Sequence, residues 1–132
     1  MGAWGYGPFE NDDAGDWIWG LENASDFDVV QAAFQTVVDS SEYADAPSCS
    51  EAIAAGEVVA ASLGRPLGGL PEEVSRWAPE NRDVPAEVVS ACRLALAAIE
   101  SRSELRDLWE EAAELDAWLQ TIRDLNARIE VS

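Results

Sequence analysis

The sequence predicts an all-α fold, a single compact bundle of about five or six helices preceded by an irregular N-terminal arm. Apolar residues recur at spacings of three and four in several segments, which is the period of a helix with one buried face. No segment alternates apolar and polar residues for long enough to predict a strand. The 132 residues have the size of one domain, spanning 1–132, and contain no repeat and no linker that would divide it.

The N-terminal arm comprises residues 1–10, in which glycine and proline alternate with aromatic residues that we expect to hold the arm on the core. The first helix is predicted over 11–22. Asn11 is a residue type that caps helices, and Asp12 and Asp13 follow in the first turn, where carboxylates stabilise the helix dipole. The buried face of this helix is expected to contain Ala14, Trp17, Ile18 and Leu21.

Two helices are predicted next, over 25–38 and 48–63. Ser25 is expected to cap the first, whose apolar stripe has spacings of three and four. This stripe consists of Phe27, Val30, Phe34 and Val37. In the second helix, Gly56 lies on the apolar seam and predicts a close crossing by another helix. Gly64 is expected to end that helix.

The remaining helices are predicted over 71–77, 85–101 and 103–129. Prolines leave room only for the short first one, and Pro85 suits the first turn of the second. Ser103 is expected to cap the last and longest helix, whose apolar seam continues without a break. We interpret this helix as the central core helix of the bundle, the alternative being an interface for a partner helix.

The charge of the chain excludes several classes of function. Acidic residues number 26 and basic residues 8, all arginine, which gives a net charge of −18. Without His and Lys the chain cannot form a Ser-His-Asp triad, a His-ligated zinc site or a Schiff base. The negative charge disfavours nucleic acids and anionic membranes. We therefore predict a non-enzymatic protein without a required cofactor. No stretch has the length of an apolar membrane span or the pattern of a signal peptide, so we expect a cytoplasmic protein. Cys49 and Cys92 lie on apolar stripes and are expected to be reduced core thiols.

Two segments rich in acidic residues predict negative strips on the surface, one on the last helix and one in the loop 39–47. The nine carboxylates are Glu104, Asp107, Glu110, Glu111, Glu114, Asp116, Asp39, Glu42 and Asp45. Such strips favour binding of a basic protein to a monomer or homodimer of this chain. The sharpest form of this hypothesis is an inhibitor or immunity-type binder of a basic toxin or nuclease. Solubility or adaptation to salt would explain the charge equally well.

An acidic and aromatic block near the N-terminus predicts an alternative function. It contains Trp4, Tyr6, Phe9, Glu10, Asn11, Asp12, Asp13 and Asp16. Carboxylate and amide oxygens are the ligands that Ca²⁺ and Mg²⁺ prefer, so the block is a candidate divalent-cation or ligand site. The metal ligands would be Asp12, Asp13 and Asp16. Helix capping and the helix dipole explain the same residues, and their spacing differs from that of an EF-hand loop.

The six tryptophans of the chain mostly fall on the predicted apolar stripes. Trp19 is the exception, because it lies off the buried face of the first helix. We expect it to pack on the N-terminal arm, and a place at a binding surface is the alternative.

Three stretches of the chain resemble a bacterial family known as domain of unknown function 4259. The first is the opening, 1–17, with its Met-Gly, Trp-Gly and aromatic residues before an Asn-Asp run. The others are 51–64 and 103–111, the latter continued by Trp118. The likeness spans nearly the whole chain and implies a domain of this size, with no activity, cofactor or catalytic residue to carry over. Gly15 departs from the larger residue expected there.

Overall fold

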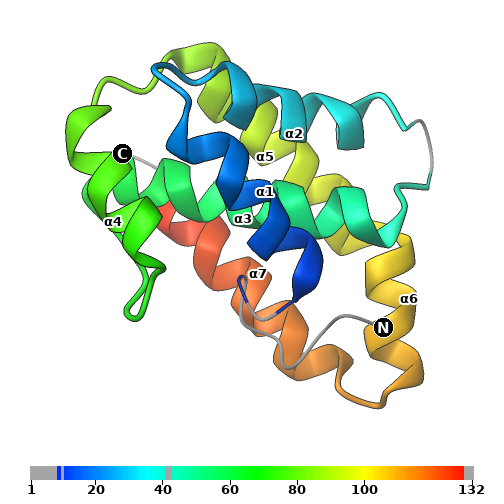
Figure 1. Cartoon of the computed structure of the whole chain (residues 1–132). Coiled ribbons are helices and arrows are strands. Elements are labelled where there is room, and N and C mark those ends of the chain that lie inside the picture. Colours follow the sequence, from blue (N-terminus) through cyan, green and yellow to red (C-terminus); the bar gives the residue numbers. More distant parts are fainter. Residues whose placement is uncertain (1–8, 10, 41–42, 130–132) are drawn as a thin grey trace.

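The structure, a computed structural model, describes residues 9, 11–40 and 43–129. These residues form seven α-helices and one short 3-10 helix, and no strand occurs among them (Figure 1). The elements are α1 (Asp12–Glu22), α2 (Asp28–Val38), α3 (Ala46–Ser62), α4 (Glu72–Trp77), η1 (Ala78–Glu80), α5 (Ala86–Ser101), α6 (Glu104–Glu111) and α7 (Leu115–Ile129). The all-α class is confirmed, but the described helices number seven where the sequence predicts five or six. None of them is long and apolar enough to cross a lipid bilayer.

Helix α3 runs through the middle of the bundle and contacts each of the other described helices. In Figure 1, α2 and α5 lie above it, α7 lies below it and α1 crosses in front. Most of α3 is buried, and its many small residues, chiefly Ala and Ser, let neighbouring helices approach from every side. The interpretation of 103–129 as the central core helix is therefore wrong, because α3 occupies that position.

The segment 103–129 also differs from the prediction because it forms two helices, α6 and α7. The N–H of Ala113 donates to the carbonyl oxygen of Glu110 at 3.0 Å. The N–H of Glu114 donates to the carbonyl oxygen of Trp109, also at 3.0 Å. This pair of bonds ends a helix at a left-handed residue, and the φ of Ala113 is 63°. A straight helix over the whole segment would be ~40 Å long, so only the corner lets both halves pack on α3.

Two of the predicted helix caps are confirmed. The side-chain oxygen of Asn11 accepts a hydrogen bond from the N–H of Ala14 at 2.8 Å, at the start of α1. The hydroxyl oxygen of Ser103 accepts from the N–H of Arg106 at 3.1 Å, at the start of α6. In both cases a side chain satisfies a backbone donor that has no partner within the helix.

The predicted start of the second helix is wrong. Ser25 does not cap a helix, because α2 begins three residues later, at Asp28. The carboxylate of Asp26 accepts a hydrogen bond from the N–H of Asp28 at 3.0 Å and so holds a turn before the helix. The helices predicted over 11–22, 48–63, 71–77 and 85–101 agree with the structure to within two residues.

The close helix crossing predicted at Gly56 is confirmed. A Cβ at this position would lie 3.0 Å from Leu125 Cδ2 on α7 and 3.6 Å from Cys92 Sγ on α5. Gly64 follows the end of α3 with a φ of 86°, as a helix-ending glycine does. Cys49 and Cys92 are both buried free thiols, as predicted.

Candidate partner-binding surface

The structure brings together two acidic segments that lie about sixty residues apart in the chain. The hydroxyl of Tyr43 donates a hydrogen bond to Asp107 Oδ2 on α6 at 2.7 Å. The N–H of Glu104 donates to the carbonyl oxygen of Ala44 at 2.9 Å. The end of the loop before α3 therefore lies along the first turn of α6. We call the group Asp45, Glu104, Asp107, Glu110 and Glu111 the α6 acidic surface.

Three of these carboxylates have structural roles. Asp45 is the N-cap of α3 and accepts from the N–H of Ser48 at 3.1 Å. Glu104 on α6 accepts from the N–H of Ala46 at 2.7 Å, so it also caps the N-terminus of α3. Asp107 accepts from Tyr43. Negative charge next to the N-terminus of α3 is favourable because of the helix dipole.

Glu110 and Glu111 lie in the last turn of α6, where both are exposed. That turn contains no basic residue. Carboxylates near a helix C-terminus interact unfavourably with the helix dipole, by about a few tenths of a kcal/mol each. The helix dipole therefore does not explain why these two acids are there.

Tyr43 is a residue of this surface that the sequence analysis missed. Tyr43 is 48% exposed. The hydrogen bond to Asp107, with smaller contributions from burial and from the charges of Asp107, Glu104 and Glu111, raises the pKa of Tyr43 to about 12. The sequence feature that could have indicated this role is the position of an aromatic residue in an otherwise polar and acidic loop.

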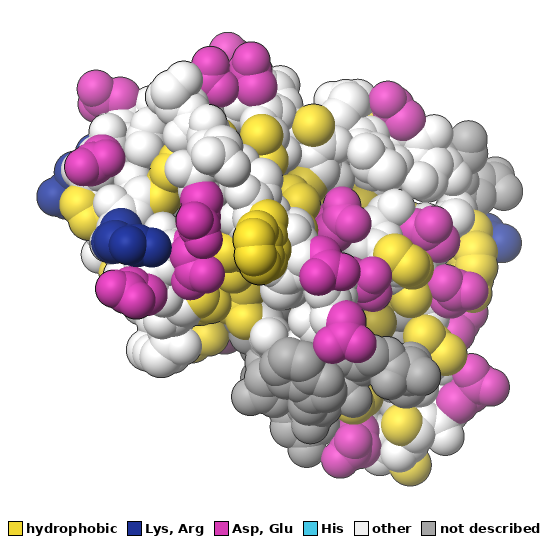
Figure 2. Space-filling view, in the orientation of Figure 1, with side chains coloured by type: hydrophobic (Ala, Val, Ile, Leu, Met, Phe, Trp, Pro, Cys, Tyr) yellow, Lys and Arg dark blue, Asp and Glu magenta, His cyan; other side chains and the backbone are white. Residues whose placement is uncertain are grey.

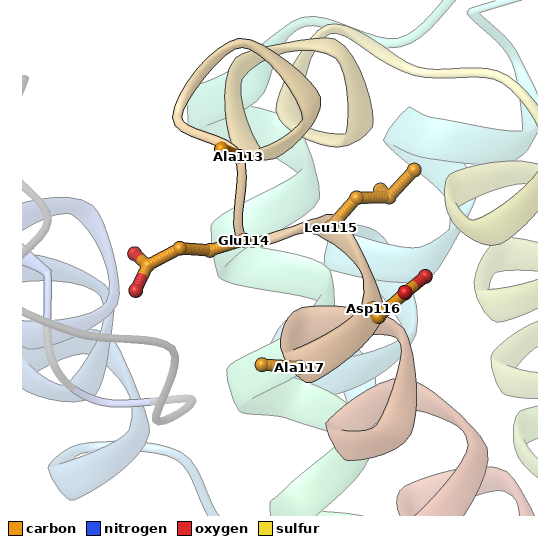
Figure 3. Close-up of a pocket in the computed structure, with 5 residues that line it drawn as sticks. All are labelled: Ala113, Glu114, Leu115, Asp116 and Ala117. Atoms are coloured by element: carbon orange, nitrogen blue, oxygen red, sulfur yellow. The ribbon is translucent and has the colours of Figure 1, made fainter.

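The other acids predicted for partner binding have different places in the fold, where the structure describes them. Asp39 is the C-cap of α2, where it accepts from Gln35 Nε2 at 2.9 Å. Glu114 and Asp116 line a shallow hollow at the corner between α6 and α7. Figure 3 shows their side chains pointing away from each other, so they form no pair of carboxylates for acid–base chemistry or chelation. Glu42 lies outside the described residues.

The N-terminal block does not assemble into a metal site in the described part of the chain. Asn11 caps α1, Asp12 and Asp16 are exposed on it, and Phe9 packs against the core. No group of three or more Cys, Asp or Glu side chains among the described residues could hold a metal ion. Trp4, Tyr6 and Glu10 lie outside these residues.

Glu51 on α3 is a second residue that the sequence analysis missed. Burial raises the pKa of its carboxyl, and the neighbouring charges of Asp13 and Asp45 raise it further. Asp13 and Asp45 belong to two different predicted sites. Asp45 caps the helix that carries Glu51, and the packing of α1 on α3 brings Asp13 near the same carboxyl group. One negative region therefore extends from the start of α1 to the N-terminus of α3.

Trp19 is 74% exposed, which is compatible with the alternative of a place at a binding surface. The N-terminal arm on which we expected it to pack lies, except for Phe9, outside the described residues. Figure 2 shows acidic side chains on both sides of hydrophobic surface over α1, while basic side chains lie toward the left and right of the view.

Comparison with known proteins identifies a family for this chain. A model of the family described as domain of unknown function (DUF4259) matches residues 2–121. No match was found among curated proteins or among solved structures. The family match includes α1 to α6 and about half of α7. The chain therefore belongs to the DUF4259 family, as its sequence motifs predict.

Proposed function

We propose that this chain is a non-enzymatic binding protein whose α6 acidic surface binds a basic protein. The observation that carries this proposal is the position of Glu110 and Glu111, exposed at the end of α6 where the helix dipole opposes negative charge. Carboxylates placed where the helix dipole opposes them favour a role in binding.

The geometry also supports the chemistry of such an interface. Tyr43 and Asp107 are held together by their hydrogen bond, so an exposed aromatic ring lies beside the carboxylates of α6. Tyrosine is enriched at interfaces because one rigid side chain supplies both apolar area and a polar group. The surrounding charge would accelerate association with a basic partner.

The sharpest form of the proposal is an inhibitor or immunity-type binder of a basic toxin or nuclease. In that form, the carboxylates of the α6 acidic surface take the place of nucleic-acid phosphates in the groove of the enzyme. Such a role needs no catalytic residue in this chain. It requires a surface of fixed negative groups, which the packing of the loop before α3 on α6 supplies.

Affinity capture at low salt, using lysate of the source organism, tests the proposal. The pure chain is compared with Glu110→Gln/Glu111→Gln and with the control Glu80→Gln/Asp83→Asn, which removes the same charge from exposed positions at the end of η1 and in the loop after it. We expect the native chain and the control to retain one basic protein at near one-to-one ratio, and the α6 variant to lose it. Titrating the chain into the purified partner should then abolish its toxin or nuclease activity at equimolar ratio. Equal capture by all three proteins would overturn the proposal.

A further inference from the structure

We propose that the outer face of α1 is a second contact surface, on which the indole of Trp19 binds an arginine side chain of a basic polypeptide. This inference takes from the proposed function only that the partner is basic. It concerns a helix distinct from α6, and its test is separate.

The exposed face of α1 combines one large apolar side chain with carboxylates. Trp19 is 74% exposed, while Ala14, Ile18 and Leu21 bury the opposite side of the helix. Asp12 and Asp16 are exposed and precede Trp19 by seven and three residues. These spacings place both carboxylates on the same face of the helix as the indole.

Gly15 leaves the space beside this tryptophan open. A Cβ at Gly15 would meet nothing within 4 Å, and its φ lies outside the left-handed region. Neither close packing nor backbone conformation therefore requires glycine there, although glycine within a helix costs about 1 kcal/mol relative to alanine. Helical side chains lean toward the N-terminus, so the indole extends toward the turn that contains Gly15. The absent side chain keeps that side of Trp19 accessible to a ligand.

The negative charge around Trp19 indicates that the ligand group is a cation. An anionic or purely apolar partner would leave Asp12 and Asp16 repelled or desolvated without a counter-charge. A guanidinium group instead stacks on the indole face and can donate hydrogen bonds to a nearby carboxylate. Glu22 lies one turn further along α1, but it lines a hollow that also contains the basic Arg76 of α4. We therefore assign recognition of the guanidinium group to Asp12 and Asp16.

The test uses a short peptide of alternating glycine and arginine as the probe. The chain is labelled with 5-fluorotryptophan, and the Trp19→Phe variant identifies the Trp19 resonance among the six in the fluorine NMR spectrum. We expect this resonance to shift saturably with the peptide while the buried tryptophans stay unmoved. Binding of the peptide with the Trp19 resonance unmoved would overturn the inference, and so would an absence of binding at low salt.

Affinity measurements with variants of unchanged net charge make the test specific. Trp19→Ala should weaken peptide binding roughly threefold to tenfold. Gly15→Leu, which favours the helix but fills the open side of the ring, should have a similar effect. Leu94→Ala removes another exposed apolar side chain, on α5, and should change nothing. A peptide that loses affinity with Glu110→Gln/Glu111→Gln but not with Trp19→Ala would overturn this inference and leave the proposed function standing.

Discussion

Arg128 on α7 and Glu57 on the central helix α3 form an ion pair with two parallel hydrogen bonds. Arg128 Nη1 donates to Glu57 Oε1 and Nη2 donates to Oε2, both at 2.8 Å. The side chain of Glu57 is 3% exposed and that of Arg128 is 17% exposed. Arg128 Nε also donates to Asp124 Oδ2 at 2.9 Å. These hydrogen bonds raise the pKa of the guanidinium, and they compensate a carboxylate that α3 would otherwise bury alone.

We predict that Arg128→Met destabilises the fold by about 3 kcal/mol, because it leaves the charge of Glu57 buried without a partner. The matched control is Arg123→Met on the same helix. Arg123 Nε donates a hydrogen bond to Glu100 Oε2 at 3.0 Å. Both side chains are more exposed than those of Arg128 and Glu57, so loss of this ion pair should cost less than about 1 kcal/mol of stability. Urea unfolding of both variants measures the difference. Equal losses would show that the burial of Glu57 does not matter.

Glu51→Gln should stabilise the protein near neutral pH. The pKa of Glu51 is raised in the folded state, chiefly by burial and then by Asp13 and Asp45. The folded protein therefore binds this proton more tightly than the unfolded chain, and ionisation of Glu51 lowers stability as pH rises through its folded pKa. Because the residue is partly solvated, we expect a gain below about 1 kcal/mol.

Thermal melts at neutral pH and near pH 3.5, where carboxyl groups bind protons, check the Glu51 prediction. The gain should shrink at the lower pH. The control Asp83→Asn removes the same charge from an exposed loop and reports the general effect of lowering the net charge. A gain no larger than in this control would contradict the argument.

Tyr43 should titrate well above an ordinary tyrosine, with a pKa of about 12. The chain has two tyrosines, so a Tyr6→Phe background lets ultraviolet absorbance follow Tyr43 alone. Asp107→Asn should move the pKa down toward its usual value, because the ionised acceptor is lost. The raised folded pKa means that this contact contributes stability below the unfolded pKa and loses it as pH rises through the folded one. An unchanged titration in Asp107→Asn would refute the role of the hydrogen bond.

Ala113→Gly should stabilise the corner between α6 and α7 by about 0.5 to 1 kcal/mol. Ala113 has a φ of 63°, a left-handed conformation that costs an L-residue about 1 kcal/mol and glycine almost nothing. Part of the gain is offset by the greater freedom of glycine in the unfolded chain. The reverse change, Gly64→Ala at a φ of 86°, should destabilise by about 1 kcal/mol. Denaturant unfolding checks both variants. A shift of the midpoint in the same direction for Ala113→Gly and Gly64→Ala would contradict the role of the left-handed conformation.

Both cysteines should be unreactive in the folded protein. Burial raises the pKa of Cys49 to about 12, and it also raises the pKa of Cys92. Almost no thiolate is then present at mildly alkaline pH, and the thiolate is the reactive form. A chromogenic disulfide reagent should therefore modify both thiols slowly in buffer and rapidly in urea. Fast modification without denaturant would mean that one of the thiols is accessible.

The sequence alone determined the features that depend on residues close together in the chain. The all-α class follows from spacings of three and four, and the caps at Asn11 and Ser103 from side chains that reach a backbone N–H three residues on. The close crossing at Gly56 and the burial of Cys49 and Cys92 follow from positions on an apolar stripe. Each of these signals acts within one or two helical turns.

Only the tertiary structure decided which distant residues meet. The apolar seam of 103–129 continues across the corner at Ala113, so no local pattern marks the break that folds α7 back onto α3. Likewise, the meeting of Tyr43 with Asp107 and of Glu57 with Arg128 spans more than sixty residues of chain. Such contacts are set by how helices of limited length pack around α3, because a helical pattern specifies which face is buried but not which helix covers it.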